Sequence, residues 1–110
     1  MANYVIAFDI STKRMKEDGH GHLISKAYIS LGKLLRSCGF TEKIQHSTYK
    51  TNNHDGINCL IELLGRIDRL RNLDNAPLFC QYAERVHFLR CEEHSDITEK
   101  FHANGADDIL

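Results

Sequence analysis

An aspartate, Asp9, closes an apolar run that begins almost at the N-terminus. The run from Tyr4 to Phe8 is short and rich in residues that favour β-structure, so it predicts a buried strand rather than a helix. A carboxylate at the point where a core strand reaches solvent is well placed for chemistry, because a rigid scaffold presents it to a cleft. The alternative is that Asp9 only ends the strand and begins a turn with Ser11 and Thr12. The segment alone leaves both interpretations open.

A basic segment follows this strand directly. Its cations, Lys13, Arg14 and Lys16, could hold a phosphate beside the aspartate. Its polar composition and two glycines predict a solvated loop, which is the simpler interpretation. His20 and His22 in the same segment are a candidate metal pair, but two imidazoles without a third ligand nearby are a weak signal for a metal site.

Length and charge restrict the class of protein. The 110 residues suit one domain spanning residues 1–110, with one modest core. A formal net charge of −1 gives no global basic field for nucleic acid, so only a local nucleic-acid site is compatible with the composition.

The cysteines and the hydropathy indicate the compartment. Cys38, Cys59, Cys80 and Cys91 are widely spaced and form no CxxC pair, so we expect four free thiols in a reduced, cytoplasmic protein. No apolar stretch has the length of a signal-peptide core or a membrane span, and we expect no membrane association.

The segments that must position these groups alternate between strand and helix. Apolar residues at helical spacing predict helices over 23–38 and 57–70, with Gly39 ending the first and Asn53 or Asp55 capping the second. Two short strands, 40–45 and 47–50, surround a tight turn near His46; both are too polar for the centre of a sheet. The later segments are a short helical turn over 78–83, a strand over 85–91 and a capping-box helix from residue 95.

This order predicts an α+β, ferredoxin-like βαββαβ fold: a four-stranded antiparallel sheet, two helices on one face and a short C-terminal helix. The first and third strands are central in that plan, so Asp9 and the segment 47–49 should be neighbours. The other face of the sheet would be open, and an exposed apolar face predicts a homodimer.

Several motifs together resemble the virulence-associated protein D family over most of the chain. They are the opening Tyr4–Asp9, Gly39–Phe40, the alternating Gln45, Ser47 and Tyr49, the helix Asp55–Leu70, and His94–Glu99 after the last strand. The family is similar in turn to the small ferredoxin-like subunit of CRISPR adaptation. The chain departs from the family pattern in the loop around His20 and His22 and in an insertion, Leu73–Tyr82.

The resemblance implies a homodimeric endoribonuclease, toxin-like or regulatory, with RNA as substrate and an antitoxin protein as a further partner. Asp9 is the catalytic residue that it carries over, with Ser47 and Tyr49 as lesser candidates. For RNA cleavage, Lys13, Arg14 and Lys50 would neutralise the phosphate, and Ser47 or Tyr49 would donate a hydrogen bond.

Two routes for Asp9 remain open. Asp9 could act without a cofactor as a general base on the 2′-hydroxyl. Alternatively, two copies of Asp9 could share a Mg²⁺ ion across a dimer axis. Two other functions also remain: a non-catalytic dimeric adaptor that binds nucleic acid or protein, as in CRISPR adaptation, and a small-ligand regulatory module that would use the glycines around His20.

Overall fold

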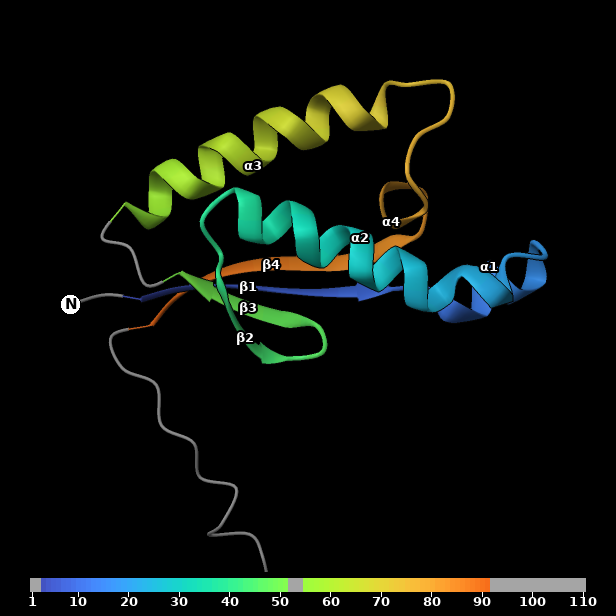
Figure 1. Ribbon diagram of the computed structural model, residues 1–110, viewed down its shortest axis with the longest axis horizontal. Helices are drawn as coiled ribbons and strands as arrows, with labels where there is room; N and C mark the ends of the chain where they lie inside the picture. Colours follow the sequence, from blue (N-terminus) through green and yellow to red (C-terminus); the bar gives the residue numbers. More distant parts are fainter. Residues whose placement is uncertain (1–2, 52–54, 92–110) are drawn as a thin grey trace, which may run out of the picture.

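The computed structural model describes residues 3–51 and 55–91 of the chain. Its helices and strands follow one another in this order (Figure 1): β1 (Asn3–Ile10), α1 (Thr12–Glu17), a short 3₁₀ helix (Gly21–Leu23), α2 (Ile24–Ser37), β2 (Glu42–Gln45), β3 (Thr48–Thr51), α3 (Gly56–Arg71), α4 (Leu78–Gln81) and β4 (Ala83–Cys91). None of the helices within these ranges is long and apolar enough to cross a membrane.

The four strands form one antiparallel sheet in the order β2-β3-β1-β4. Helices α2 and α3 lie on the same face of this sheet (Figure 1). This is the strand order of the ferredoxin-like plan, so the predicted fold class is confirmed. The predicted C-terminal helix from residue 95 lies outside the described residues, and the assignment of residues 1–110 to a single domain stays a prediction.

The side chains of strand β1 alternate between the two faces of the sheet. Ile6, Phe8 and Ile10 are buried in the core beneath the helices, whereas Asp9 between the last two is exposed. Because successive side chains of a strand point to opposite faces, Asp9 lies on the face that α2 and α3 do not cover. We call this the open face.

The segment after β1 is not the loop that its composition predicted. Residues 12–17 form helix α1, and the Ser11 hydroxyl caps it by accepting a hydrogen bond from the Arg14 backbone N–H at 3.2 Å. Met15 is fully buried in the core and fixes this turn of helix to the sheet. The polar residues around Met15 are the solvated side of a helix only six residues long, too short for a helical period to stand out.

The predictions for α2 and the β2–β3 hairpin are confirmed, with one exception. Gly39 has a positive φ of 108° directly after α2, as expected for a residue that ends a helix. Strand β2 is an edge strand, but β3 is an interior strand in spite of its polar sequence. The expectation that β3 is too polar for the centre of the sheet was wrong, because its helix-facing residues Tyr49 and Thr51 are both buried.

The later elements follow the predictions closely. Helix α3 begins directly after Asp55, whereas Asn53 lies outside the described residues. The short helical turn is α4, and the last strand is β4. Cys38, Cys59 and Cys80 are unpaired, as predicted, and burial raises the pKa of the Cys38 and Cys80 thiols.

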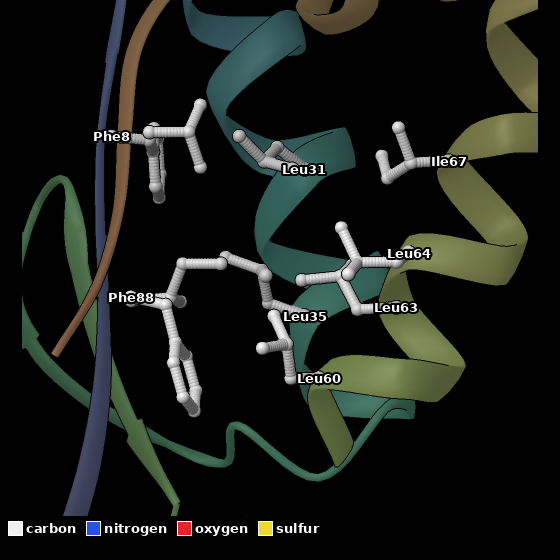
Figure 2. Close-up of a pocket in the computed structure, with 10 residues that line it drawn as sticks. Phe8, Leu31, Leu35, Leu60, Leu63, Leu64, Ile67 and Phe88 are labelled. Carbon is white, nitrogen blue, oxygen red and sulfur yellow. The ribbon is translucent and has the colours of Figure 1, made fainter. Parts of the chain in front are cut away.

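An apolar cavity of about 330 Å³ separates α3 from the sheet. In Figure 2, Phe8 and Phe88 lie on the sheet side of the cavity, Leu31 and Leu35 come from α2, and four side chains of α3 line the far side. These four are Leu60, Leu63, Leu64 and Ile67. Because its described lining contains no titratable side chain, this cavity is not a candidate for acid–base chemistry.

Candidate active site

The carboxylate of Asp9 sits at the C-terminal end of a central strand, on the open face. Its cross-strand partner on β4 is Arg85, which is also exposed. The register changes immediately afterwards: Ile10 pairs with Ala83, so Glu84 is the extra residue of a β-bulge. Bulges of this kind end regular pairing and redirect side chains, and they are frequent beside functional sites.

Two further polar side chains share this part of the open face. Both Thr48 of β3 and His87 of β4 are partners of Ala7, two residues before Asp9 on β1. Two residues of a strand span about 7 Å, so a single phosphodiester group could contact the carboxylate, Arg85 and His87. We define Asp9, Arg85 and His87 as the open-face cluster.

Sequence reasoning missed Arg85 and His87 as site residues. The sequence indicates that β4 lies beside β1, because residues 85–91 are recognisable as a strand and the ferredoxin-like plan pairs these two strands. It does not indicate which residue of β4 lies opposite Asp9, because the bulge at Glu84 sets the register of the pair.

The predicted proximity of Asp9 and Ser47 is present at the level of the backbone. The Phe8 N–H donates a hydrogen bond to the Ser47 carbonyl oxygen at 3.0 Å, so Ser47 lies beside the end of β1. Ser47 itself is half-buried in the turn between β2 and β3.

Tyr49 is not brought together with Asp9. It pairs with Ile6, a core residue, and Tyr49 as a whole residue is only 3% exposed, on the helix-covered face. The Arg36 guanidinium lies 5.5 Å from the ring centroid, and the hydroxyl lies so close to Gly32 that a Cβ there would overlap it. Tyr49 therefore faces the opposite side of the sheet from the carboxylate.

The three candidate phosphate ligands occupy different places. Lys13 and Arg14 are exposed on α1, which lies beyond the end of β1 (Figure 1), so both are near Asp9 along the chain. Lys50 is opposite Val5, four residues and roughly 13 Å along the sheet from Asp9. Its ammonium group pairs with Glu42 at 3.3 Å. Lys50 is thus separate from the open-face cluster.

Helix α1 is held against the start of β4 by Tyr82. The Tyr82 hydroxyl donates a hydrogen bond to the Asp18 carboxylate at 2.6 Å, and the Ser11 N–H donates to the Tyr82 carbonyl at 2.8 Å. The hydrogen bond to Asp18 raises the pKa of the Tyr82 phenol. Arg14 lies over the same ring at 5.3 Å, so these contacts fix the position of the basic helix beside the end of β1.

The structure places His20 and His22, the candidate metal pair, in different surroundings. His20 packs edge-on against Tyr82 with ring centroids 6.1 Å apart, whereas His22 is exposed. No group of three or more metal-ligating side chains occurs within residues 3–51 and 55–91. A metal site at Asp9 would therefore draw on ligands from beyond this set, such as a second copy of Asp9.

Comparison with known proteins identifies the family of the chain. No family model matches the chain. The chain is 35% identical over 95 residues to the endoribonuclease VapD homolog of Neisseria gonorrhoeae, and the match covers 86% of this chain and 94% of that relative. The length and identity of this match confirm what the sequence motifs indicated: the chain belongs to the virulence-associated protein D family.

Proposed function

We propose that the protein is an endoribonuclease in which Asp9 is the catalytic carboxylate. The observation that carries this proposal is the exposure of Asp9 at the end of a rigid central strand, directly opposite Arg85. A carboxylate beside a guanidinium can take a proton while the cation stabilises the charge that develops on the phosphate. The relative from Neisseria gonorrhoeae, which is named an endoribonuclease, supports RNA as the substrate.

In the route without a metal, Asp9 takes the proton of the 2′-hydroxyl, and that oxygen attacks phosphorus. The bond from phosphorus to the 5′-oxygen breaks, and the leaving oxygen takes a proton, for which His87 of the open-face cluster is the candidate donor. Arg85 stabilises the charged phosphorane. The products are a 2′,3′-cyclic phosphate and a 5′-hydroxyl.

In the metal route, Asp9 and its copy in a second protomer would hold a Mg²⁺ ion, which would supply an activated water as the nucleophile. This route requires a homodimer joined through the open face. Val5 and Leu89 are cross-strand partners on that face, and Leu89 is about half exposed, so the face offers apolar surface to a second copy. The products are then a 3′-hydroxyl and a 5′-phosphate.

The same open face supports the second candidate function, a dimeric adaptor without catalysis. In that case the face would bind a second copy together with nucleic acid or a protein partner, and Asp9 would have no chemical role. A toxin-like or regulatory role and an antitoxin partner belong to the endoribonuclease proposal and rest on the family resemblance. The proposed cytoplasmic location rests on the wide spacing of the cysteines.

The test compares wild type, Asp9→Asn and the control Asp74→Asn, which alters an exposed aspartate between α3 and α4. Each purified protein is incubated with end-labelled RNA, with and without chelator, and the product ends are identified. Cleavage by wild type and Asp74→Asn but not by Asp9→Asn supports the enzyme. Full cleavage by Asp9→Asn refutes the role of Asp9, and RNA binding without cleavage by wild type supports the adaptor. Growth and RNA integrity in cells that overexpress wild type or Asp9→Asn test the toxin-like role.

A further inference from the structure

A polar cleft lies on the helix-covered side of the sheet, between α2 and the β2–β3 hairpin. Its volume is about 390 Å³, which is within the range of small-molecule sites. Its lining differs from that of the apolar cavity under α3, because it combines aromatic rings with cationic side chains. We call it the hairpin cleft.

Aromatic side chains form one wall and the floor of the hairpin cleft. His46, in the hairpin turn, packs on Tyr28 of α2 with ring centroids 4.1 Å apart and planes inclined by 33°. His46 is exposed, so its imidazole is accessible for a further ring to stack on. Tyr49 lies beneath, and both tyrosines contact Phe8 of the core at ring distances of 6.0 and 6.2 Å. The wall is therefore supported by packed rings.

Three cations surround these rings. Lys33 and Arg36 come from α2 and Lys43 from β2, and all three are exposed. The described part of the lining contains no carboxylate, and none of the ion pairs found among the described residues involves these three cations. The cleft is thus a local positive site in a chain whose formal net charge is −1.

The hairpin turn connects this cleft with the open-face cluster. His46 precedes Ser47, whose carbonyl accepts a hydrogen bond from the N–H of Phe8 at 3.0 Å, and Asp9 is the next residue of β1. A polynucleotide that passes around the tip of the hairpin would therefore meet Asp9 on one side of the sheet and His46 on the other.

We propose that the hairpin cleft binds a nucleotide of single-stranded RNA near the phosphodiester that is cleaved at Asp9. The base stacks on His46, and Lys33, Arg36 and Lys43 contact the phosphates. Exposed aromatic rings combined with cations are how proteins bind single strands without reading their sequence. This inference rests on the proposed endoribonuclease function and assigns part of its substrate-binding site.

The first test measures RNA binding by fluorescence anisotropy. The probe is a short single-stranded RNA with 2′-O-methyl groups, used with chelator so that neither route can cleave it. The double variant Lys33→Gln/Lys43→Gln is compared with Lys26→Gln/Arg69→Gln, which removes the same charge from exposed positions outside the cleft lining. We expect the cleft variant to weaken binding at least tenfold and to lower the slope of log affinity against log salt by roughly 1.4, as for two lost phosphate contacts.

The second test separates stacking from charge. His46→Ala should weaken binding about tenfold, whereas His46→Phe, which keeps an aromatic ring, should bind as wild type does. Both variants lie in an exposed turn, and their melting temperatures show whether they are folded. Equal weakening by His46→Ala and His46→Phe would contradict a stacking site.

The outcomes distinguish this inference from the function on which it rests. If wild type neither binds nor cleaves RNA, the proposed function fails and the cleft assignment fails with it. If wild type cleaves RNA and the cleft and control pairs bind equally well, only the cleft assignment is overturned.

Discussion

Asp9 and Tyr49 come from neighbouring strands, β1 and β3, and point to opposite faces of the sheet. The two residues therefore cannot contact the same phosphate. In the proposed function, the groups for bond cleavage lie on one side of the sheet, and the aromatic and cationic groups that bind RNA lie on the other. We expect substitutions on the open face to lower kcat and substitutions in the hairpin cleft to raise KM.

Replacing Asp9 by asparagine should remove activity and leave the fold intact. The amide has the same shape but can neither take a proton nor ligate a metal, so the cleavage rate should fall by roughly a hundredfold or more. Asp9 is exposed, and exposed substitutions usually cost at most about 0.5 kcal/mol, so the melting temperature should change by only a few degrees. Calorimetry and a cleavage time course on the same preparation measure both effects. A large drop in melting temperature would show that Asp9 is structural.

Arg85→Gln should lower kcat by about a hundredfold, because it removes the charge that stabilises the phosphorane. Arg85→Lys, which keeps the charge, should lose less activity. Single-turnover cleavage at saturating RNA measures the effect without a contribution from binding. Unchanged kcat in Arg85→Gln would remove Arg85 from the proposed mechanism.

The protein should be a homodimer that Leu89→Glu dissociates. Leu89 lies on the open face at 48% exposure, and two copies of a new carboxylate would repel each other there. The control is Ile61→Glu, because Ile61 is an exposed apolar residue of α3 at 62% exposure. Light scattering at tens of micromolar protein, enough to populate ordinary micromolar dimers, should show a dimer for wild type and the control and a monomer for Leu89→Glu. A monomeric wild type would contradict the interface and remove the metal route.

Met15→Ala should destabilise the protein by about 2–5 kcal/mol, the usual cost of truncating a fully buried side chain of this size. Met15 is 0% exposed and is the buried residue of α1. The substitution should therefore detach α1 and lower the midpoint of urea unfolding. If residues 12–17 were a solvated loop, the midpoint would not move.

Tyr82→Phe should destabilise the protein at neutral pH, and the difference from wild type should vanish in alkali. The hydrogen bond to Asp18 raises the pKa of Tyr82 above its ordinary value of about 10, so the folded protein favours the neutral phenol. That stabilisation is fully present below the ordinary value and is lost as pH rises through the raised pKa. Urea unfolding of both proteins from pH 7 to pH 11 tests the sign. A difference that grew with pH would contradict it.

The parts of the fold that were predicted well have a strong apolar pattern. The apolar stripe of α2, with Ala27, Leu31 and Leu35 buried, and the continuous apolar run of β1 are each long enough to identify the type of element. Helix α1 buries only Met15 among its six residues. The polar composition of the segment therefore predicted a loop, although Met15 fixes a helix to the core.

The candidate site was predictable only in part, because strand register decides which face each side chain occupies. Asp9 was recognisable from its place at the end of β1. The face of Tyr49 depends on its pairing with Ile6, and the position of Arg85 depends on the bulge at Glu84. A shift of one residue in either ladder would turn every following side chain to the other face, and a single sequence has no record of that shift.

The apolar cavity beneath α3 has a consequence for assays that detect exposed apolar surface by dye fluorescence. Leu64 and Val86, which line the cavity, are more than half exposed, so the cavity is open to solvent. Dyes such as ANS bind exposed apolar surface and are used to recognise partly unfolded states. The native protein should bind such a dye at this cavity, so dye fluorescence alone would not distinguish a partly unfolded state of this chain from the folded one.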